Sequence, residues 1–147
     1  MHNKLLKSFY IICFMIIIPQ TSKTLATNQI TVQNSEIGVI IQIDNNLLFE
    51  DDNLDLRPRG YNTLDKIGEI IKNSNKTCIV ESNTTKNKYK NSIASSDWEL
   101  TIIRSDNIIN YLINHHNINP QKLFSNGFGE KLPNQYLNNR TDFILKD

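Results

Sequence analysis

The sequence contains little cysteine, glycine and proline, and it has no apolar run of membrane-spanning length. Its 147 residues include two cysteines, five glycines and four prolines, which excludes a disulfide-rich scaffold and a low-complexity or collagen-like chain. The longest apolar run, from Phe9 to Ile18, covers ten residues, whereas a helix that crosses a bilayer needs about 20. The remaining composition, 39% hydrophobic and 21% charged, is typical of a single globular domain.

The N-terminus has the three parts of a secretory signal. Lys4 and Lys7 precede the apolar run, Pro19 ends it, and Thr24-Leu25-Ala26 places small residues where a signal peptidase cleaves. We therefore expect residues 1–26 to be a signal peptide. An uncleaved membrane anchor stays as an alternative. A lipoprotein signal is disfavoured because no small residue precedes Cys13.

Removal of residues 1–26 changes both the charge and the cysteine content. The segment carries three lysines and no acid, so 13 basic and 15 acidic residues remain, a net charge of −2. Such a chain has no basic field to bind nucleic acid, and we expect no nucleic-acid partner. Only Cys78 remains, within the apolar segment Thr77–Val80, where a buried, inert thiol is expected.

No set of residues predicts catalysis or a cofactor. A nucleophilic Cys78 would need a nearby base, and His115 and His116 fall at the end of a helix, where we expect exposed polar residues. The acids between Glu50 and Asp55 lack the glycine and the final glutamate of a calcium loop. We expect a non-enzymatic protein without a cofactor or metal.

The rest of the chain predicts an α+β domain, a two-layer α/β sandwich with the order β-α-β-α-β-β. Residues 27–36 are polar and aperiodic, which favours a flexible leader before a domain at 37–147. Trp98 falls on one broad helical face with Ile108, Ile109 and Leu112. The expected strands are 38–43, 77–81, 123–125 and 141–145. A first helix is expected at 61–72, and a second helix starts after a cap at Ser96 or Asp97 and is ended by Asn117 to Pro120. Loops are expected at 45–60 and 82–96, and a turn at Gly127 and Gly129.

Four ordered segments resemble the OmpA-like domain family of peptidoglycan-binding proteins, in particular its MotB periplasmic branch. They are VESNTT at Val80–Thr85, SDWELTIIRS at Ser96–Ser105, GFGEKLP at Gly127–Pro133 and NNRTDFIL at Asn138–Leu145. The tryptophan-glutamate-leucine start of the helix and the 19-residue step from Thr85 to Arg104 match this branch. The resemblance covers about residues 37–147.

This resemblance implies binding of peptidoglycan through the diaminopimelate of its stem peptide. Diaminopimelate carries carboxylate and ammonium groups, so its site needs an arginine for the carboxylate and an acid for the ammonium. Arg104 falls on the carboxylate-binding arginine of the family, and Arg140 on a second arginine near the site. Phe49 and the segment Leu56–Pro58 fit the earlier part of the pattern.

The sequence departs from the family at the ammonium partner. The family's threonine-aspartate pair is Thr84-Thr85 here, and Ser82 and Asn83 replace its glycine and its histidine or tyrosine. Asp97 stands where this branch usually has asparagine. In one hypothesis, Asp97 supplies the negative charge that the family has at the Thr85 position. In the alternative, Asp97 only caps the helix, and the pocket has lost its ability to bind the ligand.

Two functions follow from the resemblance. The first is an exported module in the periplasm, associated with the cell wall or outer membrane, that binds peptidoglycan. The second is a structural subunit of an envelope machine, such as a secretion system, that has lost this binding. Arg104, Arg140 and Asp97 favour the first, whereas Thr85 favours the second. A homodimer is left open, and a stator role is disfavoured because the Phe9–Ile18 run has no acid to carry ions.

Overall fold

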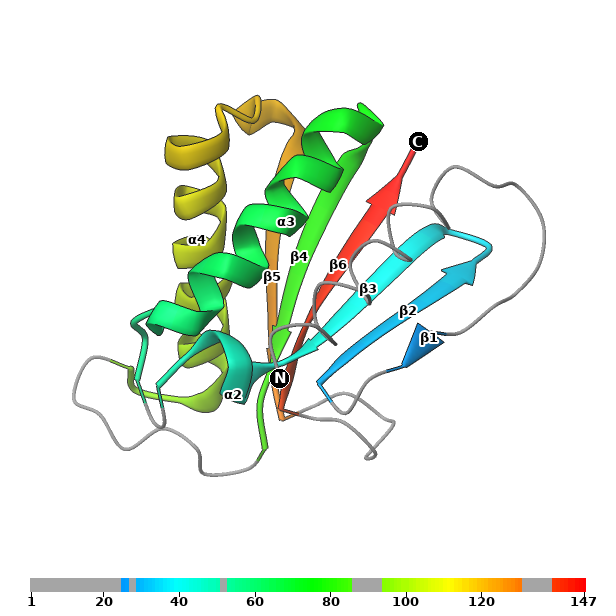
Figure 1. The fold of residues 1–147 in the computed structure, drawn as a ribbon. Helices are drawn as coiled ribbons and strands as arrows, with labels where there is room; N and C mark the ends of the chain where they lie inside the picture. The colour runs from blue at the N-terminus through cyan, green and yellow to red at the C-terminus, as the bar shows by residue number, and fades with distance from the viewer. Residues whose placement is uncertain (1–24, 27–28, 51–52, 86–93, 131–138) are drawn as a thin grey trace.

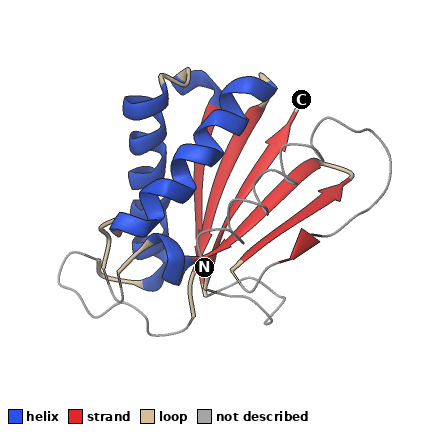
Figure 2. Ribbon diagram, viewed as in Figure 1, coloured by secondary structure: helices blue, strands red, loops and turns tan. Residues whose placement is uncertain are grey.

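The structure, a computed structural model, is a mixed sheet with its helices on one face (Figures 1 and 2). It describes residues 25–26, 29–50, 53–85, 94–130 and 139–147. Six strands lie in the order β1-β2-β3-β6-β4-β5. All neighbours pair antiparallel except β4 and β5, which are parallel. The elements are β1 Leu25–Ala26, β2 Ile30–Ser35, β3 Gly38–Asp44, α2 Asn45–Leu48, α3 Pro58–Ser74, β4 Thr77–Asn83, α4 Asp97–His116, a 3-10 turn at Pro120–Lys122, β5 Leu123–Gly129 and β6 Arg140–Lys146.

This arrangement confirms the predicted two-layer fold. From Gly38 onward, the strands and long helices follow the expected order, and the short helix α2 is added in the 45–60 loop. The two long helices form one layer, and the sheet forms the other (Figure 2). Among the described residues, no helix is both long and apolar enough to cross a membrane.

The expected flexible leader at 27–36 is wrong for most of its length. Ile30–Ser35 forms strand β2, which pairs with β3 along its whole length. Ile30 and Val32 are each only 2% exposed, and they alternate with Thr31 and Gln33. A strand with one buried face needs few apolar residues, so two of them in a polar segment were too weak a signal to predict it.

The core lies between the sheet and the long helices. Cys78 and Val80 of β4 lie beside Leu145 and Phe143 of β6, and all four are fully buried. Burial raises the pKa of the Cys78 thiol to about 12, so the thiol stays protonated and unreactive as expected. The long helices contribute Leu64, Ile67, Ile70 and Ile71 of α3, and Ile108 and Leu112 of α4.

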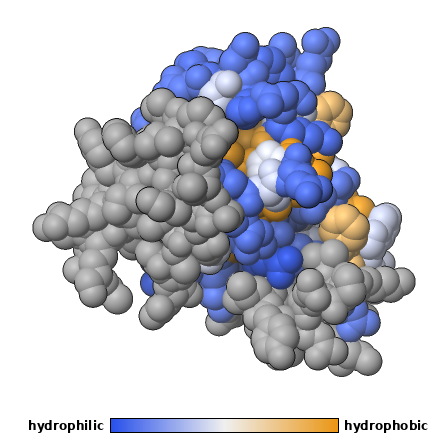
Figure 3. Space-filling view, turned by 90° about the vertical axis from the view of Figure 1, so that its right-hand side faces the viewer, coloured by the Kyte–Doolittle hydropathy of each residue, from blue (hydrophilic) through white to orange (hydrophobic). Residues whose placement is uncertain are grey.

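The opposite face of the sheet carries one narrow apolar row. Ile40 pairs with Ile144, Ile144 with Ile79, and Ile79 with Phe124, so the row crosses four strands. The next row is polar, with Asp142 between Gln42 and Glu81. On the side that the space-filling view presents, hydrophobic residues lie among hydrophilic ones (Figure 3).

Both ends of helix α4 are capped, the first by a side chain and the last by the backbone. The Ser96 hydroxyl accepts a hydrogen bond from the Glu99 amide at 3.1 Å, and the Glu99 carboxylate accepts from the Ser95 amide and hydroxyl. The arrangement is similar to a capping box, except that the Glu99 carboxylate binds the residue before the cap and not the cap itself. Ser96 is therefore the cap, and Asp97 is the first residue of the helix. Asn117 ends the helix in the left-handed conformation, with φ 52°.

The predicted grouping of Trp98 with Ile108 and Leu112 on one apolar face of the helix is wrong, because Trp98 is 57% exposed and the other two are fully buried. The backbone of Trp98 lies against Gly129 of the edge strand β5. A glycine presents no side chain on which an indole could pack. The buried residues of α4 instead include Leu100, Ile108 and Leu112.

Gly127 and Gly129 do not form the predicted turn, since β5 continues through both residues. A Cβ atom at position 127 would lie 2.5 Å from the backbone nitrogen of Ile102 in α4. The Ser105 hydroxyl donates to the Asn126 carbonyl oxygen at 2.8 Å, so α4 approaches β5 closely at this residue as well. These small residues therefore bring α4 against the edge strand.

The expected exposure of both histidines is correct only for His115. His116 packs its ring over Gly68 of α3 and lies 3.0 Å from the Asp65 carboxylate. The Tyr111 hydroxyl donates to the same carboxylate at 2.7 Å. Burial raises the pKa of Asp65, but the hydrogen bonds from Tyr111 and His116 outweigh burial and leave it below its usual value. This polar group joins the two long helices.

Candidate functional site

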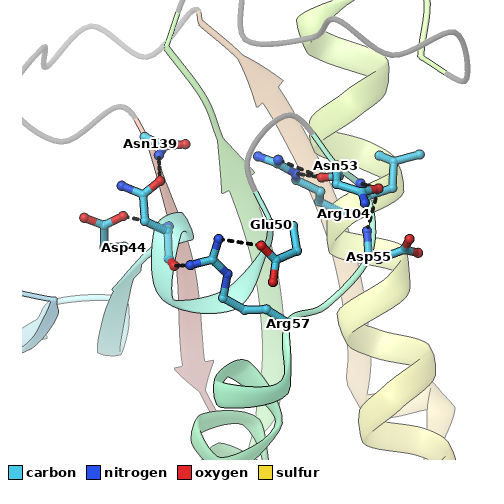
Figure 4. A network of polar contacts seen from close by, with 9 residues as sticks. Asp44, Glu50, Asn53, Asp55, Arg57, Arg104 and Asn139 are labelled. Atoms are coloured by element: carbon cyan, nitrogen blue, oxygen red, sulfur yellow. Dashed lines mark hydrogen bonds and ion pairs between the residues drawn. The ribbon is translucent and has the colours of Figure 1, made fainter.

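Arg104 is buried between helix α4 and the segment that follows β3. Its side chain rises from the second turn of α4 and is only 3% exposed. The guanidinium carbon lies 4.7 Å from the centre of the Phe49 ring, a cation-π contact. The Nε and Nη2 atoms both donate to the Asn53 carbonyl oxygen, at 3.0 and 2.7 Å (Figure 4).

The backbone around Phe49 is fixed by local hydrogen bonds. Asp44 caps the short helix α2 by accepting from the Asn46 amide at 2.8 Å. The Phe49 amide donates to the Asn45 carbonyl oxygen at 2.8 Å, and Phe49 forms an isolated antiparallel bridge with Leu56. Phe49 is 1% exposed. Its ring therefore forms a rigid support under the guanidinium.

Arg57, from the predicted family pattern, has a structural role. Its Nη1 donates to the Asn46 carbonyl oxygen at 2.8 Å, and its Nη2 pairs with the Glu50 carboxylate at 3.0 Å (Figure 4). The Arg57 amide also donates to the Leu48 carbonyl oxygen at 2.9 Å. Through Glu50 and Arg57, these contacts fix the chain before and after Asn53, whose carbonyl oxygen binds Arg104.

Asn107 is a residue of this site that the sequence analysis missed. It follows Arg104 by three positions, so both side chains project from neighbouring turns of one helix face. The Asn107 Nδ2 donates to the Leu54 carbonyl oxygen at 3.0 Å. Arg104 and Asn107 therefore hold two successive carbonyl groups. The only signal in the sequence was the three-residue spacing from Arg104 to Asn107. This spacing does not show that the Asn107 side chain binds a backbone carbonyl group.

The predicted threonine pair divides between the interior and the surface. Thr84 is fully buried, and its amide donates to the Gly129 carbonyl oxygen at 2.9 Å. Gly129 in turn donates from its amide to the Thr101 hydroxyl, one turn before Arg104. Thr85 is exposed. Of this pair, Thr84 lies in the interior beside α4, and Thr85 faces solvent.

Arg140 belongs to a different face of the sheet. Its Nε donates to both carboxylate oxygens of Asp142, at 2.9 and 3.0 Å. Thr141, between them in β6, instead donates to Asn45, and side chains alternate along a strand. Burial raises the pKa of Asp142, although the charge of Arg140 partly offsets this effect. The resemblance places Arg140 near the site of Arg104, whereas its contacts with Asp142 lie on the opposite face of the sheet.

A buried polar group lies where β4, β6 and α2 meet. Asn45 donates to the Asn83 carbonyl oxygen and accepts from the Thr141 hydroxyl, both at 2.7 Å. Within the described part of the chain, the amide atoms of the Asn83 side chain and the Thr84 hydroxyl are buried without a hydrogen-bond partner. Such atoms are uncommon in folded proteins, and a polar ligand or water could satisfy them.

A protein-family model and several solved structures are similar to this chain. The sequence model of the OmpA family matches residues 48–143, and no curated protein is significantly similar to the chain. The periplasmic domain of Helicobacter pylori MotB has 22% identity and a TM-score of 0.71, over 86% of this chain and 85% of that chain.

Two further solved structures share the fold at lower identity. The cell wall anchor of the T6SS from Pseudomonas aeruginosa has 14% identity and a TM-score of 0.70, over 81% of this chain and 89% of that chain. An outer membrane protein from Borrelia burgdorferi B31 has 19% identity and a TM-score of 0.65, over 82% of this chain and 100% of that chain. With its strand order, its helices and the match over 48–143 taken together, this chain belongs to the OmpA family.

Proposed function

We propose that this protein is an exported, non-catalytic module of the cell envelope that binds peptidoglycan through diaminopimelate. The observation that carries the proposal is the buried Arg104 guanidinium, supported by the Phe49 ring at the position that the family pattern predicts. One of the solved structures with a similar fold is described as a cell wall anchor. A guanidinium shielded from water binds a carboxylate more strongly than an exposed one.

The ammonium of the ligand requires a partner other than Thr85. Thr85 is exposed and uncharged. Asp97 precedes Arg104 by seven residues, which is two helical turns and nearly the same side of α4. Because Ser96 caps the helix, the Asp97 carboxylate is not the cap that the alternative hypothesis required. We assign the ammonium contact to Asp97.

Binding to the wall is tested with purified sacculi and with a diaminopimelate-containing muropeptide. The protein is expected to sediment with sacculi, and Asp97→Asn is expected to weaken muropeptide binding by roughly tenfold, the effect of losing one charged hydrogen bond. Calorimetry measures the affinity. Asp106→Asn, an exposed aspartate of the same helix, is the matched control. If Asp97→Asn binds as well as the parent protein, the charge has not moved to Asp97, although the wall-binding proposal stands.

A structural subunit without wall binding is the second candidate. The observation that favours it is that Arg104 already donates two hydrogen bonds to the backbone of its own chain. A pure scaffold would stay in the supernatant when sacculi are sedimented. Sedimentation of the wild-type protein therefore separates the two functions in one measurement.

Export by the N-terminal signal is part of the proposal. Cleavage after Ala26 would remove Leu25–Ala26, the short strand β1 that pairs with Val32 and Thr31 of β2. The mature protein is then expected to begin at Thr27, which mass spectrometry of the protein purified from cells measures directly. A mass that includes Met1, or a lipid on Cys13, would contradict this prediction.

A further inference from the structure

A short strap of four residues, Asn53–Leu56, covers Arg104. The backbone of the strap is bound from α4 by Arg104 at the Asn53 carbonyl and by Asn107 at the Leu54 carbonyl. The Leu54 side chain is 6% exposed and packs in a small apolar cluster with Ala94 and Leu100. The strap is therefore a folded part of the domain and lies directly on the proposed ligand-binding group.

The strap occupies the Nε–Nη2 edge of the guanidinium, one of the two edges that can bind a carboxylate as a planar fork. An arginine binds a carboxylate in a planar fork, with two N–H groups donating to two oxygens. In this structure two N–H groups, on Nε and Nη2, point to the single neutral oxygen of Asn53. A carboxylate offers two charged oxygens to the same N–H groups, and it is the stronger partner. Ligand and strap therefore compete for Arg104.

Asn107 holds the strap without using the Arg104 guanidinium. Its amide donates to Leu54, one residue beyond the carbonyl that Arg104 binds. It is half-buried, and its only described hydrogen-bond partner is the strap. We propose that Asn107 is a positioning residue that latches the strap over Arg104, so that a carboxylate ligand binds only when the strap is released. This inference rests on the proposed binding of diaminopimelate at Arg104.

If Asn107 latches the strap, removing its side chain should increase the affinity for the ligand. When only an open fraction of a protein can bind, the measured affinity is reduced by that fraction. Asn107→Ala removes one hydrogen bond from the closed state and raises the open fraction by roughly fivefold, the typical effect of one neutral hydrogen bond. Affinity for the ligand should rise by the same factor. A merely structural role for Asn107 would leave the affinity unchanged or lower it.

The experiment compares three proteins in their purified full form. Wild type, Asn107→Ala and the control Asn110→Ala, an exposed asparagine one turn further along α4, are titrated with a diaminopimelate-containing muropeptide in a calorimeter. Amide hydrogen exchange across Asn53–Arg57 is measured with and without the muropeptide. The expected result is roughly fivefold tighter binding for Asn107→Ala only, faster exchange in that variant, and faster exchange of the wild-type strap when the ligand is bound.

The outcomes separate this inference from the proposed function. If wild type binds and Asn107→Ala binds equally well or more weakly, the strap is not a latch, and the proposed function remains. If neither protein binds the muropeptide, the proposed function is wrong, and the latch falls with it. Binding by both proteins, with tighter binding and faster strap exchange in Asn107→Ala, supports both.

Discussion

Replacing Arg104 by alanine is expected to lower the free energy of unfolding by about 2–4 kcal/mol. The substitution removes two hydrogen bonds from a charged donor to the Asn53 carbonyl, and a buried acceptor without a partner costs about 1–3 kcal/mol. It also removes the group that packs on the Phe49 ring, which leaves a cavity beside a buried aromatic residue. Urea unfolding followed by circular dichroism measures the change.

Arg59→Ala is the matched control, since Arg59 is an exposed arginine near the start of α3. Exposed substitutions of this kind usually change stability by less than about 0.5 kcal/mol. Arg104→Lys keeps the charge but cannot present a planar fork, so its stability should lie between wild type and alanine. A loss below about 0.5 kcal/mol for Arg104→Ala would show that the guanidinium is not held as described.

The same variant separates stability from wall binding. At a temperature where Arg104→Ala is still folded, it should fail to sediment with sacculi, because a carboxylate of the wall has lost its donor. Arg59→Ala should sediment like the wild type. If folded Arg104→Ala sediments normally, the wall is bound elsewhere on the molecule, and Arg104 is a structural residue only.

The parts of the fold with strong periodicity could be predicted from the sequence. The apolar spacing of Leu64, Ile67 and Ile71 gave helix α3, and the polar start at Ser96 with Glu99 gave the beginning of α4. The run Gly38–Ile43 gave the central strand β3. In each segment, the side chains themselves carry the pattern, and local and tertiary preferences agree.

The failures share a different physical cause. Strand β2 depends on its pairing with β3, and Gly127 depends on the approach of α4, so neither is determined by neighbouring residues. The cover over Arg104 consists of backbone carbonyl groups from Asn53 and Leu54. A backbone carbonyl is present at every residue, so the sequence cannot show which one binds a side chain. The family pattern therefore located Arg104 but not the strap.

Gly127 shows how the fold constrains the site. Its conformation does not require glycine, because among the described glycines only Gly38 and Gly129 have positive φ. The constraint is space, since an added Cβ would meet the Ile102 backbone nitrogen at 2.5 Å and the Thr101 hydroxyl at 2.8 Å. A helix backbone cannot turn aside as a flexible side chain can. Alanine at this position must therefore push this part of α4 away from β5.

Gly127→Ala is accordingly expected to lower the free energy of unfolding by about 1–3 kcal/mol, the usual cost of overpacking. Asn126→Ala, at the neighbouring exposed position of the same strand, should cost less than about 0.5 kcal/mol. Urea unfolding of both variants measures the difference. Since Thr101 and Ile102 lie in the same turn of α4 as Arg104, the displaced helix should also loosen the hydrogen bonds to Asn53 and speed amide exchange in the strap. Wild-type stability in Gly127→Ala would mean that α4 has room at β5, and that the close packing described for this edge is not what positions Arg104.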